Sequence, residues 1–458
     1  MRVAALVPAG FLAGAALCAW MLRSAPAGIA VDRAQPLVVV TYWQQFGAQM
    51  WLAFALAIAI ASVGYVATLR ARRPSTARGA VRYLTMTSIV SALACAAALL
   101  FPVVFSSDVY AYAGYGDMAL HGISPYAHAR VALRDPLLDA MLWQWGNPPP
   151  MCVYGPAFVW LTQAIVALFM PLGAAAPLWA LRVLACIALV ASAPLAYGAF
   201  RAFPQSTRLA AAAGIALNPI AIWSAAEGHN DTLALAIVLA GFALAARSRL
   251  FTGALVVALS ALVKAPGAVA AAALVAASWG DRLRFTRTAA GAAVGIAVVA
   301  GLAVPLEYGV RAHLAPQGHY VPQFSLQYVS VWLAVGIGLW LLVAATRVDR
   351  LSMTPYLAFA AFVAIPNPYP WYGVWLVPVA FLAWRSWASW ALIAASLLIA
   401  VRYYGDATTD LSRPLSIAVV AVEFALPLVL LTVHMASARR GRREIRTRVP
   451  GFATPRSP

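Results

Sequence analysis

Asp108 is the residue whose type and position most strongly suggest chemistry. It begins the stretch DVYAYAGYGD, a few residues after an apolar run over residues 83–104. An ionisable side chain so close to membrane depth is costly, and it is usually kept for function or for pairing. A carboxyl group with the reference pKa of about 4 is ionised at neutral pH, so Asp108 could accept a proton as a general base. Asp117 is a second candidate, for substrate binding.

A second group of polar residues interrupts an otherwise apolar stretch. It is the sequence Glu227-Gly228-His229-Asn230-Asp231, placed between two apolar runs. Capping of the following helix by Asn230 or Asp231 would explain one residue and leave Glu227 and His229 unexplained. We therefore favour a substrate-binding role for Glu227, His229, Asn230 and Asp231, with helix capping as the alternative.

Two cations could hold a phosphate group. Lys264 is the only lysine in the chain, and it lies between two short apolar runs, residues 251–263 and 267–279. Such a hairpin would place it near the external boundary of the membrane, as a point charge for a lipid phosphate or as an anchor that reaches the surface. Arg311, in the predicted external loop 307–325, is a second phosphate-binding candidate, with simple solvation as the alternative.

Aromatic residues accompany these charges. Residues 365–375 read IPNPYPWYGVW, in which three prolines force a non-helical segment carrying Tyr369, Trp371 and Tyr372. We expect these three and Tyr154 to contact substrate, the alternative being an aromatic belt at the membrane surface. The four cysteines lack zinc-type spacing, so we expect no metal and no other cofactor. A divalent metal is the one cofactor that the carboxylates leave open.

Apolar runs of membrane-crossing length must position these residues. Of the 458 residues, 63% are hydrophobic and 10% are charged, whereas soluble domains carry about 25% charged residues. A helix needs about 20 apolar residues to span a bilayer core. The sequence therefore predicts an all-α polytopic membrane protein with 12–14 transmembrane helices. The predicted spans are residues 3–22, 50–69, 83–104, 177–200, 209–226, 232–246, 251–263, 267–279, 288–306, 326–345, 352–365, 374–384, 387–402 and 414–434.

Arginines set the orientation of these spans. They account for 31 of the 32 basic residues and cluster in short segments between apolar runs, for example in residues 70–82 and in the tail 435–458. The positive-inside rule places these clusters and both termini in the cytoplasm. With that orientation 10 of the 14 acidic residues fall on the external side. Carboxylate chemistry is therefore expected on the external face.

Three boundaries follow from this topology. We expect one transmembrane domain over residues 1–434, followed by a basic cytoplasmic tail, 435–458. The first large external loop covers about residues 105–176, and within it residues 156–172 form a juxtamembrane or re-entrant helix. A full crossing by that helix is the alternative, and it would change the sidedness of the segments that follow. The first run is read as a retained helix, with a cleaved signal peptide as the alternative.

Taken in order, these motifs resemble those of the GT-C superfamily of membrane glycosyltransferases. Asp108 with YAYAGYG, then GISPY, YGP, GHND, the Lys264 hairpin and PNPYPWYGVW are most similar to the polyprenol-phosphate-mannose-dependent α-mannosyltransferases of actinobacteria and their bacterial relatives. The likeness covers about residues 83–380. In many such enzymes the acidic loop follows the first helix, whereas here it follows the third. A neighbouring pair of carboxylates is also common there, whereas serines precede Asp108.

The resemblance implies a GT-C-like bundle and an inverting glycosyltransferase of the bacterial inner membrane. A hexose, with mannose as the favoured sugar, would pass from a polyprenyl phosphate to a hydroxyl of a glycan or lipid acceptor on the periplasmic or external face. Asp108 would be the base, Lys264 and Arg311 would hold the phosphate, and the other candidates would shape the sugar or acceptor pocket. Membrane lipids are expected partners and nucleic acid is not. The alternatives are a transporter or flippase of lipid-linked sugars, and a structural factor in envelope polysaccharide assembly.

Overall fold

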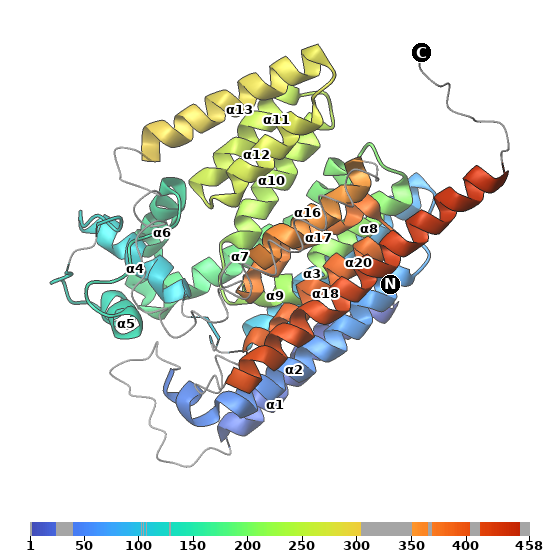
Figure 1. Cartoon of the computed structure of the whole chain (residues 1–458). Coiled ribbons are helices and arrows are strands. Elements are labelled where there is room, and N and C mark those ends of the chain that lie inside the picture. The colour runs from blue at the N-terminus through green and yellow to red at the C-terminus, as the bar shows by residue number, and fades with distance from the viewer. Residues whose placement is uncertain are drawn as a thin grey trace.

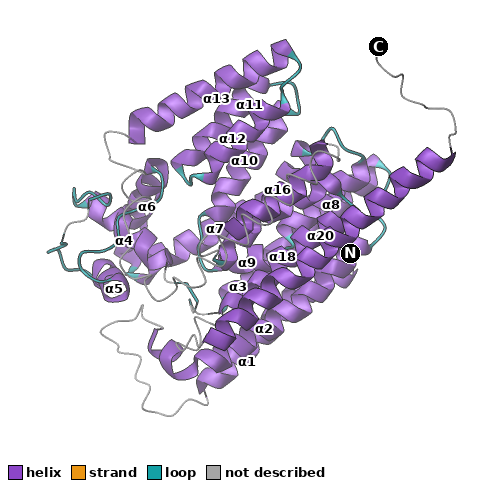
Figure 2. Cartoon of the chain, viewed as in Figure 1, coloured by secondary structure: helices purple, strands orange, loops and turns teal. Residues whose placement is uncertain are grey.

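The chain folds into helices throughout the part that the structure describes. The computed structural model describes residues 2–23, 40–303, 350–403 and 413–448, without residues 102, 104, 107, 128, 129 and 365–368. Within these ranges there are α-helices and short 3₁₀ helices but no strand (Figure 2). The predicted all-α fold is therefore confirmed.

Five helices are long and apolar enough to cross a membrane. Of these, α1 (Leu6–Arg23) continues a short 3₁₀ helix, η1 (Arg2–Ala5), and α2 (Val40–Arg70) has its apolar part over Trp51–Arg70. The others are α3 (Ala77–Leu99), α7 (Ala175–Ala199) and α13 (Arg282–Ala303). Val63, Leu93 and Ile187 leave 62%, 56% and 59% of their surface uncovered on three of these helices. Large apolar side chains so exposed are typical of a surface that faces lipid. The chain is therefore a multi-pass membrane protein.

A bent pair of helices forms a possible sixth crossing. Helices α8 (Gln205–Ala216) and α9 (Pro219–Ala226) meet at an angle of 41°. Asn218 caps α9, because its side-chain oxygen accepts hydrogen bonds from the backbone N–H groups of Ile220 and Ala221. Pro219 occupies the first position of α9, where the missing N–H group is harmless. The break at Asn218 thus starts the helix whose end carries Glu227.

Shorter apolar helices complete the bundle. The predicted spans that lie in described residues all coincide with helices, and the Lys264 hairpin is formed as expected; the span predicted at 326–345 lies outside the described residues. The number of crossings stays a prediction. The shorter elements are α10 (Asp231–Ala245), α11 (Leu250–Leu259), η3 (Ser260–Leu262), α12 (Pro266–Ala277), α16 (Arg350–Ala364), η5 (Pro370–Trp375), α17 (Leu376–Ala380), η6 (Phe381–Ala383), α18 (Trp387–Leu398), η7 (Ile399–Val401) and α20 (Arg413–Arg448).

The predicted external loop is more helical than the sequence suggested. It contains α4 (Asp108–Leu120) and α5 (Pro136–Trp145) in addition to the expected helix, which is α6 (Pro156–Phe169) with η2 (Met170–Leu172). The stretch YAYAGYG has weak helix propensity, and the tertiary burial of α4 over Val109–Met118 overrides it. Helix α6 packs against both α4 and α7. Its juxtamembrane placement stays a prediction.

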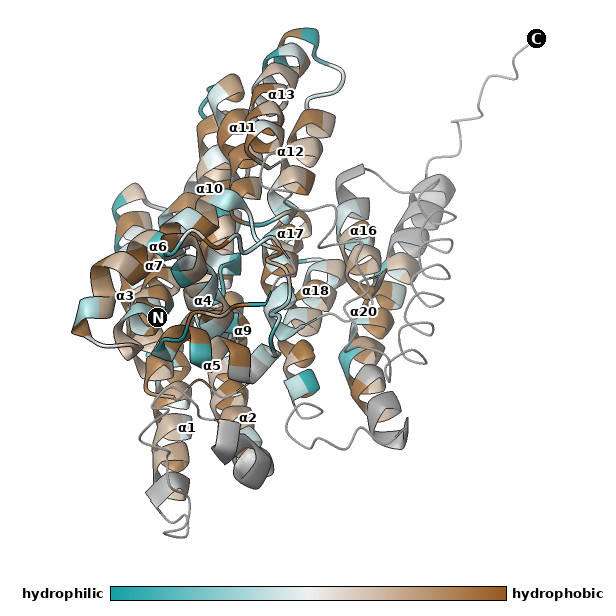
Figure 3. Ribbon diagram, turned by 90° about the vertical axis from the view of Figure 1, so that its left-hand side faces the viewer, coloured by the Kyte–Doolittle hydropathy of each residue, from teal (hydrophilic) through white to brown (hydrophobic). Residues whose placement is uncertain are grey.

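Two groups of helices frame the site. Helix α1 packs against α2 and α3, and α18 packs against α20, whereas α10, α11, α12 and α13 form a second group, with α4, α5 and α6 at one end of the molecule (Figure 1). Hydrophobic residues predominate along the helices of both groups (Figure 3). The predicted boundary at residue 434 falls inside α20, so the beginning of the basic tail continues that helix. The division into one domain and a tail stays a prediction.

Candidate active site

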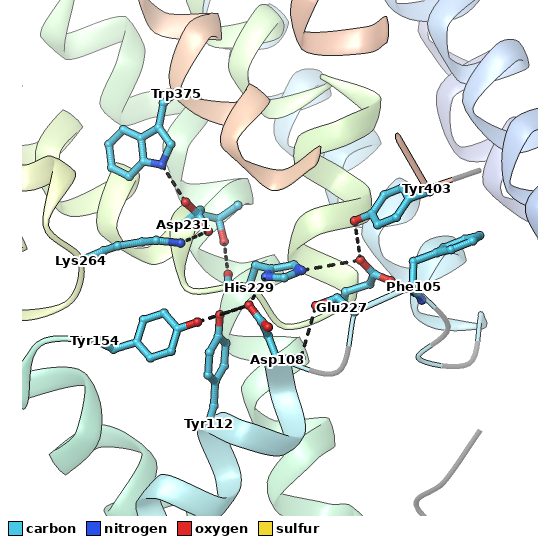
Figure 4. A network of polar contacts seen from close by, with 12 residues as sticks. Phe105, Asp108, Tyr112, Tyr154, Glu227, His229, Asp231, Lys264, Trp375 and Tyr403 are labelled. Carbon is cyan, nitrogen blue, oxygen red and sulfur yellow. Dashed lines mark hydrogen bonds and ion pairs between the residues drawn. The ribbon is translucent and has the colours of Figure 1, made fainter. Parts of the chain in front are cut away.

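Asp108 begins helix α4, and its carboxylate is held by two tyrosines. The hydroxyl of Tyr112 donates to Oδ2 of Asp108 over 3.2 Å, and the hydroxyl of Tyr154 donates to the same oxygen over 3.3 Å (Figure 4). The backbone N–H of Asp108 donates to Oγ of Ser106 over 3.3 Å. The N-terminus of a helix favours a negative charge. The side chain is 13% exposed, so this carboxylate is held in place and still accessible.

His229 lies between two carboxylates. Its Nδ1 is 3.5 Å from Oδ2 of Asp108, and its Nε2 is 3.6 Å from Oε2 of Glu227, distances of ion pairs without hydrogen-bond geometry. Gly228 makes the turn with φ of +88°, and a Cβ on it would lie 2.9 Å from Cγ2 of Val109. Only glycine adopts such a turn without strain. The imidazole is therefore fixed by the turn and enclosed by the protein.

Glu227 joins the ends of three helices. Its Oε1 accepts a hydrogen bond of 3.1 Å from the backbone N–H of Phe105, which follows α3. Its Oε2 accepts a hydrogen bond of 2.9 Å from the hydroxyl of Tyr403, which follows α18 and η7. Glu227 itself caps α9 and is 2% exposed. It thereby ties the segment that precedes Asp108 to the turn that carries His229.

Buried Arg182 secures the same junction from α7. Its Nε donates to the carbonyl oxygen of Ala226 over 2.5 Å, and its Nη2 donates to the carbonyl oxygen of Phe101 over 2.9 Å. These carbonyls lie at the end of α9 and just after α3, where helix ends leave carbonyl groups without a partner and favour a positive charge. The buried guanidinium of Arg182 thus supplies hydrogen-bond donors to carbonyl groups at two helix ends.

Asp231 and Lys264 form a buried ion pair. Asp231 is the first residue of α10 and is fully buried; its Oδ2 is 2.5 Å from Nζ of Lys264. Its Oδ1 accepts a hydrogen bond of 2.7 Å from the indole of Trp375. Nζ of Lys264 also lies 5.8 Å from the ring centroid of Tyr154 and 5.4 Å from that of Tyr372, within cation–π range. With its side chain 11% exposed, Lys264 retains access to a ligand.

Gly155 brings the Lys264 hairpin to the Asp108 side. Its backbone N–H donates to the carbonyl oxygen of Val263 over 3.2 Å. A Cβ at Gly155 would lie only 2.1 Å from the carbonyl oxygen of Leu262. Close contact of the two backbones therefore requires glycine at this position. Because Tyr154 precedes Gly155, its ring reaches both Asp108 and Lys264.

Three stacked rings form one wall of this cluster. The ring of Trp371 lies parallel to that of Tyr369, with centroids 4.5 Å apart and an interplanar angle of 3°. Trp371 also stacks on the imidazole of His229, at 4.0 Å and 21°. Trp371 therefore packs against His229, which lies between the carboxylates of Asp108 and Glu227, and the role of the aromatic residues in shaping a substrate pocket stays a prediction.

The charges in the cluster depend on one another. Burial lowers the pKa of His229, but the carboxylates of Asp108 and Glu227 outweigh this and raise it to about 9. Burial raises the pKa of Asp108, but His229, Lys264 and the Tyr112 hydroxyl bring it below its ordinary value. At neutral pH the cluster therefore contains a cationic imidazole beside an ionised Asp108.

Most of the predicted site residues meet in this cluster. Asn230 occupies the N-cap position of α10 without a capping hydrogen bond, and Asp231 bonds Lys264 and Trp375, so the capping alternative is wrong for both side chains. Both polar atoms of the Asn230 amide are buried, with no hydrogen-bond partner in the described part of the chain. The predicted residues that the structure brings together are Asp108, Tyr154, Glu227, His229, Asn230, Asp231, Lys264, Tyr369, Trp371 and Tyr372.

Two candidates are not part of the cluster as described. Asp117 lies further along α4, about 13 Å from Asp108 at 1.5 Å per residue. It pairs with His121 at 3.3 Å, and burial together with neighbouring Asp135 raises its pKa to about 7. Arg311 lies outside the described residues. In the described ranges no three His, Cys, Asp or Glu side chains come close enough to hold a metal ion.

Several residues of the site were not among the candidates. Tyr112 lies four residues after Asp108, a spacing that places both on one face of a helix, so a predicted helix would have revealed it. Trp375 is the last residue of the aromatic segment 365–375, three residues after Tyr372, and could have been included among the candidates. Nothing in the local sequence around Tyr403 or Arg182 points to Glu227 or to helix ends.

Comparisons with known proteins find one family and one curated relative. The family model MptA_B, described as "Alpha-(1->6)-mannopyranosyltransferase, N-terminal domain", matches residues 8–280. Alpha-(1->6)-mannopyranosyltransferase A of Corynebacterium glutamicum is 28% identical over 182 residues, which are 38% of this chain. The matched part spans 36% of that relative, little more than a third of its length. No solved structure matches the chain.

Proposed function

The chain belongs to the MptA_B family of α-(1→6)-mannopyranosyltransferases, and from this membership we propose that it transfers mannose from a polyprenyl-phosphate donor to an acceptor hydroxyl. One observation carries the proposal. An ionised carboxylate, Asp108, and a buried cation, Lys264, are connected through the single side chain of Tyr154. Transfer from a lipid phosphate needs a base for the acceptor and a positive charge for the leaving group.

Asp108 acts on the acceptor in this proposal. Its carboxylate removes the hydroxyl proton while the hydroxyl oxygen attacks the anomeric carbon on the face opposite the phosphate. The bond between the anomeric carbon and the phosphate oxygen breaks, and its electron pair stays on the lipid phosphate. One displacement without a covalent intermediate inverts the anomeric carbon. A β-linked donor therefore gives an α-linked product, which agrees with the α linkage in the family's name.

Lys264 acts on the leaving group. A lipid phosphate is already a stable anion, so it needs a nearby cation more than a proton donor. One hydrogen of the ammonium group is directed to Asp231, and two remain for phosphate oxygens. Asp231 and Trp375 restrict the lysine to one position. Arg311 is retained as a proposed second phosphate ligand, and no metal or other cofactor is proposed.

Sugar recognition is proposed for Asn230 and the aromatic wall. The buried Asn230 amide has both donor and acceptor capacity available, and it lies between His229 and Asp231. Burying such a group without a partner is unfavourable, so a sugar hydroxyl that completes its hydrogen bonds would be selected. Trp371 and Tyr372 are proposed to bound the same space, and Asp117 would contact only an extended acceptor.

The site is proposed to face the exterior, the periplasm of the bacterial inner membrane. Helix α3, the bent pair α8–α9, and α18 with η7 begin near Arg70 and Arg385, and they lead at their other ends to Phe105, Glu227 and Tyr403. Helix α3 has 23 residues, about 34 Å, against a bilayer core of about 30 Å. The positive-inside rule assigns the arginine-rich end to the cytoplasm, which supports an external position for the site.

Incubation with lipid-linked sugars tests this function. Purified protein would be given polyprenyl phosphates that carry mannose, glucose, galactose or arabinose, together with an α-mannoside acceptor. We expect release of polyprenyl phosphate and an α-linked product with the mannosyl donor in particular. Movement of intact donor across a proteoliposome membrane, with no release of lipid phosphate, would contradict the transferase proposal and support the flippase alternative.

A further inference from the structure

A second charged site lies at the opposite end of the bundle from Asp108. There the ends of α2, α8 and α18 surround a pocket of about 450 Å³, a volume in the range of small-molecule sites. The pocket is lined by four arginines and two tryptophans, together with small and apolar residues. These six residues are Arg70, Arg72, Arg73, Trp384, Arg385 and Trp390.

The tryptophans hold two of the arginines in place. The guanidinium carbon of Arg70 lies 5.3 Å from the ring centroid of Trp390, and that of Arg73 lies 5.1 Å from the ring of Trp384. Nη2 of Arg73 also donates to the carbonyl oxygen of Leu69 over 2.7 Å, while its buried Nε has no partner in the described part of the chain. The guanidinium groups are thus positioned by rings and backbone and keep donors for a ligand.

The positive charge of the pocket is not neutralised by the described residues. Arg70, Arg72, Arg73 and Arg385 form no ion pair with a carboxylate in the described ranges. Arg385 has a φ of +73°, a left-handed conformation that is unfavourable for a side chain of this size. Burial, and to a smaller extent the charge on Arg385, lower the pKa of Arg73. Four like charges gathered in one pocket, one of them on a strained turn, indicate a site for an anion.

Two helix N-termini add to the same potential. Ser206, in the first turn of the twelve-residue helix α8, lines the pocket. Arg385 lies just before α18, whose N-cap is Ser386. The positive ends of both helices therefore point toward the arginines, and helix N-termini bind phosphate groups well. These features together favour a compact anion such as a phosphate group.

We propose that this pocket binds the phosphate group of an anionic phospholipid in the leaflet opposite the active site. Tryptophan and arginine together are typical of headgroup depth, and basic pockets between transmembrane helices recognise anionic lipid headgroups. The pocket lies about one bilayer thickness from Asp108 along α3. This lipid is separate from the sugar donor and takes no part in the transfer reaction.

Lipid binding by native mass spectrometry tests the proposal. Delipidated protein would be titrated with phosphatidylglycerol, with phosphatidylcholine and with inorganic phosphate, for wild type, for the double variant Arg72→Gln/Arg385→Gln and for the control Arg247→Gln/Arg249→Gln. The control removes two exposed arginines between α10 and α11. We expect phosphatidylglycerol to bind wild type and control equally, and the double variant at least about tenfold more weakly.

Three outcomes would overturn the proposal. They are equal affinity for phosphatidylglycerol and phosphatidylcholine, an equal loss in the control variant, and inorganic phosphate binding as tightly as the lipid, which would indicate a soluble anion. A thermal unfolding scan without lipid identifies a misfolded variant. If the double variant unfolds at a lower temperature than wild type, Arg72→Gln alone would be used instead, and it too should bind phosphatidylglycerol more weakly than wild type. Because transfer activity is not the readout, failure here leaves the proposed function untouched.

Discussion

The two charged regions of the molecule differ in how their charges are balanced. Around Asp108 each ionised side chain has an internal partner: His229 lies between Asp108 and Glu227, and Asp231 holds Lys264. In the arginine pocket, tryptophan rings contact Arg70 and Arg73, a backbone carbonyl also binds Arg73, and no described carboxylate balances the four guanidinium groups. The first region is organised before substrate arrives, whereas the second requires an anion from outside.

Burial explains why the first region needs internal partners. Asp231 and His229 are fully buried, and a buried charge without a partner is strongly destabilising. Arg70, Arg72 and Arg385 are exposed, where water and a headgroup can balance charge. Substitutions should therefore reduce the free energy of unfolding around Asp108 and leave it almost unchanged in the pocket.

Among the residues that support Asp108, Lys264 is expected to give the largest effect. Lys264→Met leaves the fully buried Asp231 without its cation, which should lower the free energy of unfolding by about 3–5 kcal/mol. Denaturation in detergent measures this. The double variant Lys264→Met/Asp231→Asn should regain much of the stability while the use of donor stays impaired. A single variant as stable as wild type would show that the pair is not a structural ion pair.

His229 is expected to control the alkaline side of the pH profile. Its pKa of about 9 means that the imidazole is cationic at neutral pH and loses its proton as pH rises through that value. Transfer by wild type should therefore fall above about pH 9, whereas His229→Gln should be about tenfold slower and lack that decline. The control is His121→Gln, on a half-exposed ring outside the cluster. A wild-type profile without an alkaline decline contradicts this role.

Gly155 is expected to act through backbone contact. Gly155→Ala forces a methyl group against the carbonyl oxygen of Leu262, so the Lys264 hairpin must shift, at a cost of about 1–3 kcal/mol in stability. The apparent KM for donor should rise with it. Gly301→Ala is the matched control, because nothing lies within 4 Å of its Cβ position. Equal midpoints of unfolding for the two variants would refute the close approach.

Tyr112 should give the smallest effect. Tyr112→Phe removes one of the two tyrosine hydrogen bonds to Asp108 and leaves that from Tyr154. A hydrogen bond to a charged group contributes about 1.5–3 kcal/mol, part of which the remaining donors replace. We expect a few-fold lower kcat and a modest upward shift of the acidic limb of the pH profile. An unchanged acidic limb would mean that the hydroxyl does not stabilise the carboxylate.

The sequence predicted on which side of the membrane the candidate site residues lie. Asp108, Glu227 and Lys264 each lie at a predicted span end that the arginine clusters assign to the external side, so topology predicted that they would share one face of the membrane. The sequence did not predict helix α4, and this explains the poor placement of Asp117. Nine residues along an α-helix turn through about 900°, which puts Asp117 on the face opposite Asp108.

Pairing between the elements could not be predicted in the same way. That Lys264 binds Asp231, or that Tyr403 reaches Glu227, depends on side-chain positions in the packed bundle. Residues 33 and 176 positions apart carry no local signal of contact. The fold class could be predicted because a lipid bilayer requires a crossing chain to satisfy its backbone hydrogen bonds internally, as a helix does. The polar contacts inside the bundle depend instead on tertiary packing.

The central claim is that Asp108 is the base for transfer. Its most direct test is the rate of polyprenyl phosphate release from polyprenyl-phosphate mannose by Asp108→Asn, with donor binding measured on the same sample. Asp139→Asn, on a half-exposed acid of α5 that pairs with Arg134, is the control. We predict a loss of at least about 100-fold in the rate with donor affinity nearly unchanged. Turnover by Asp108→Asn at the wild-type rate would contradict the account.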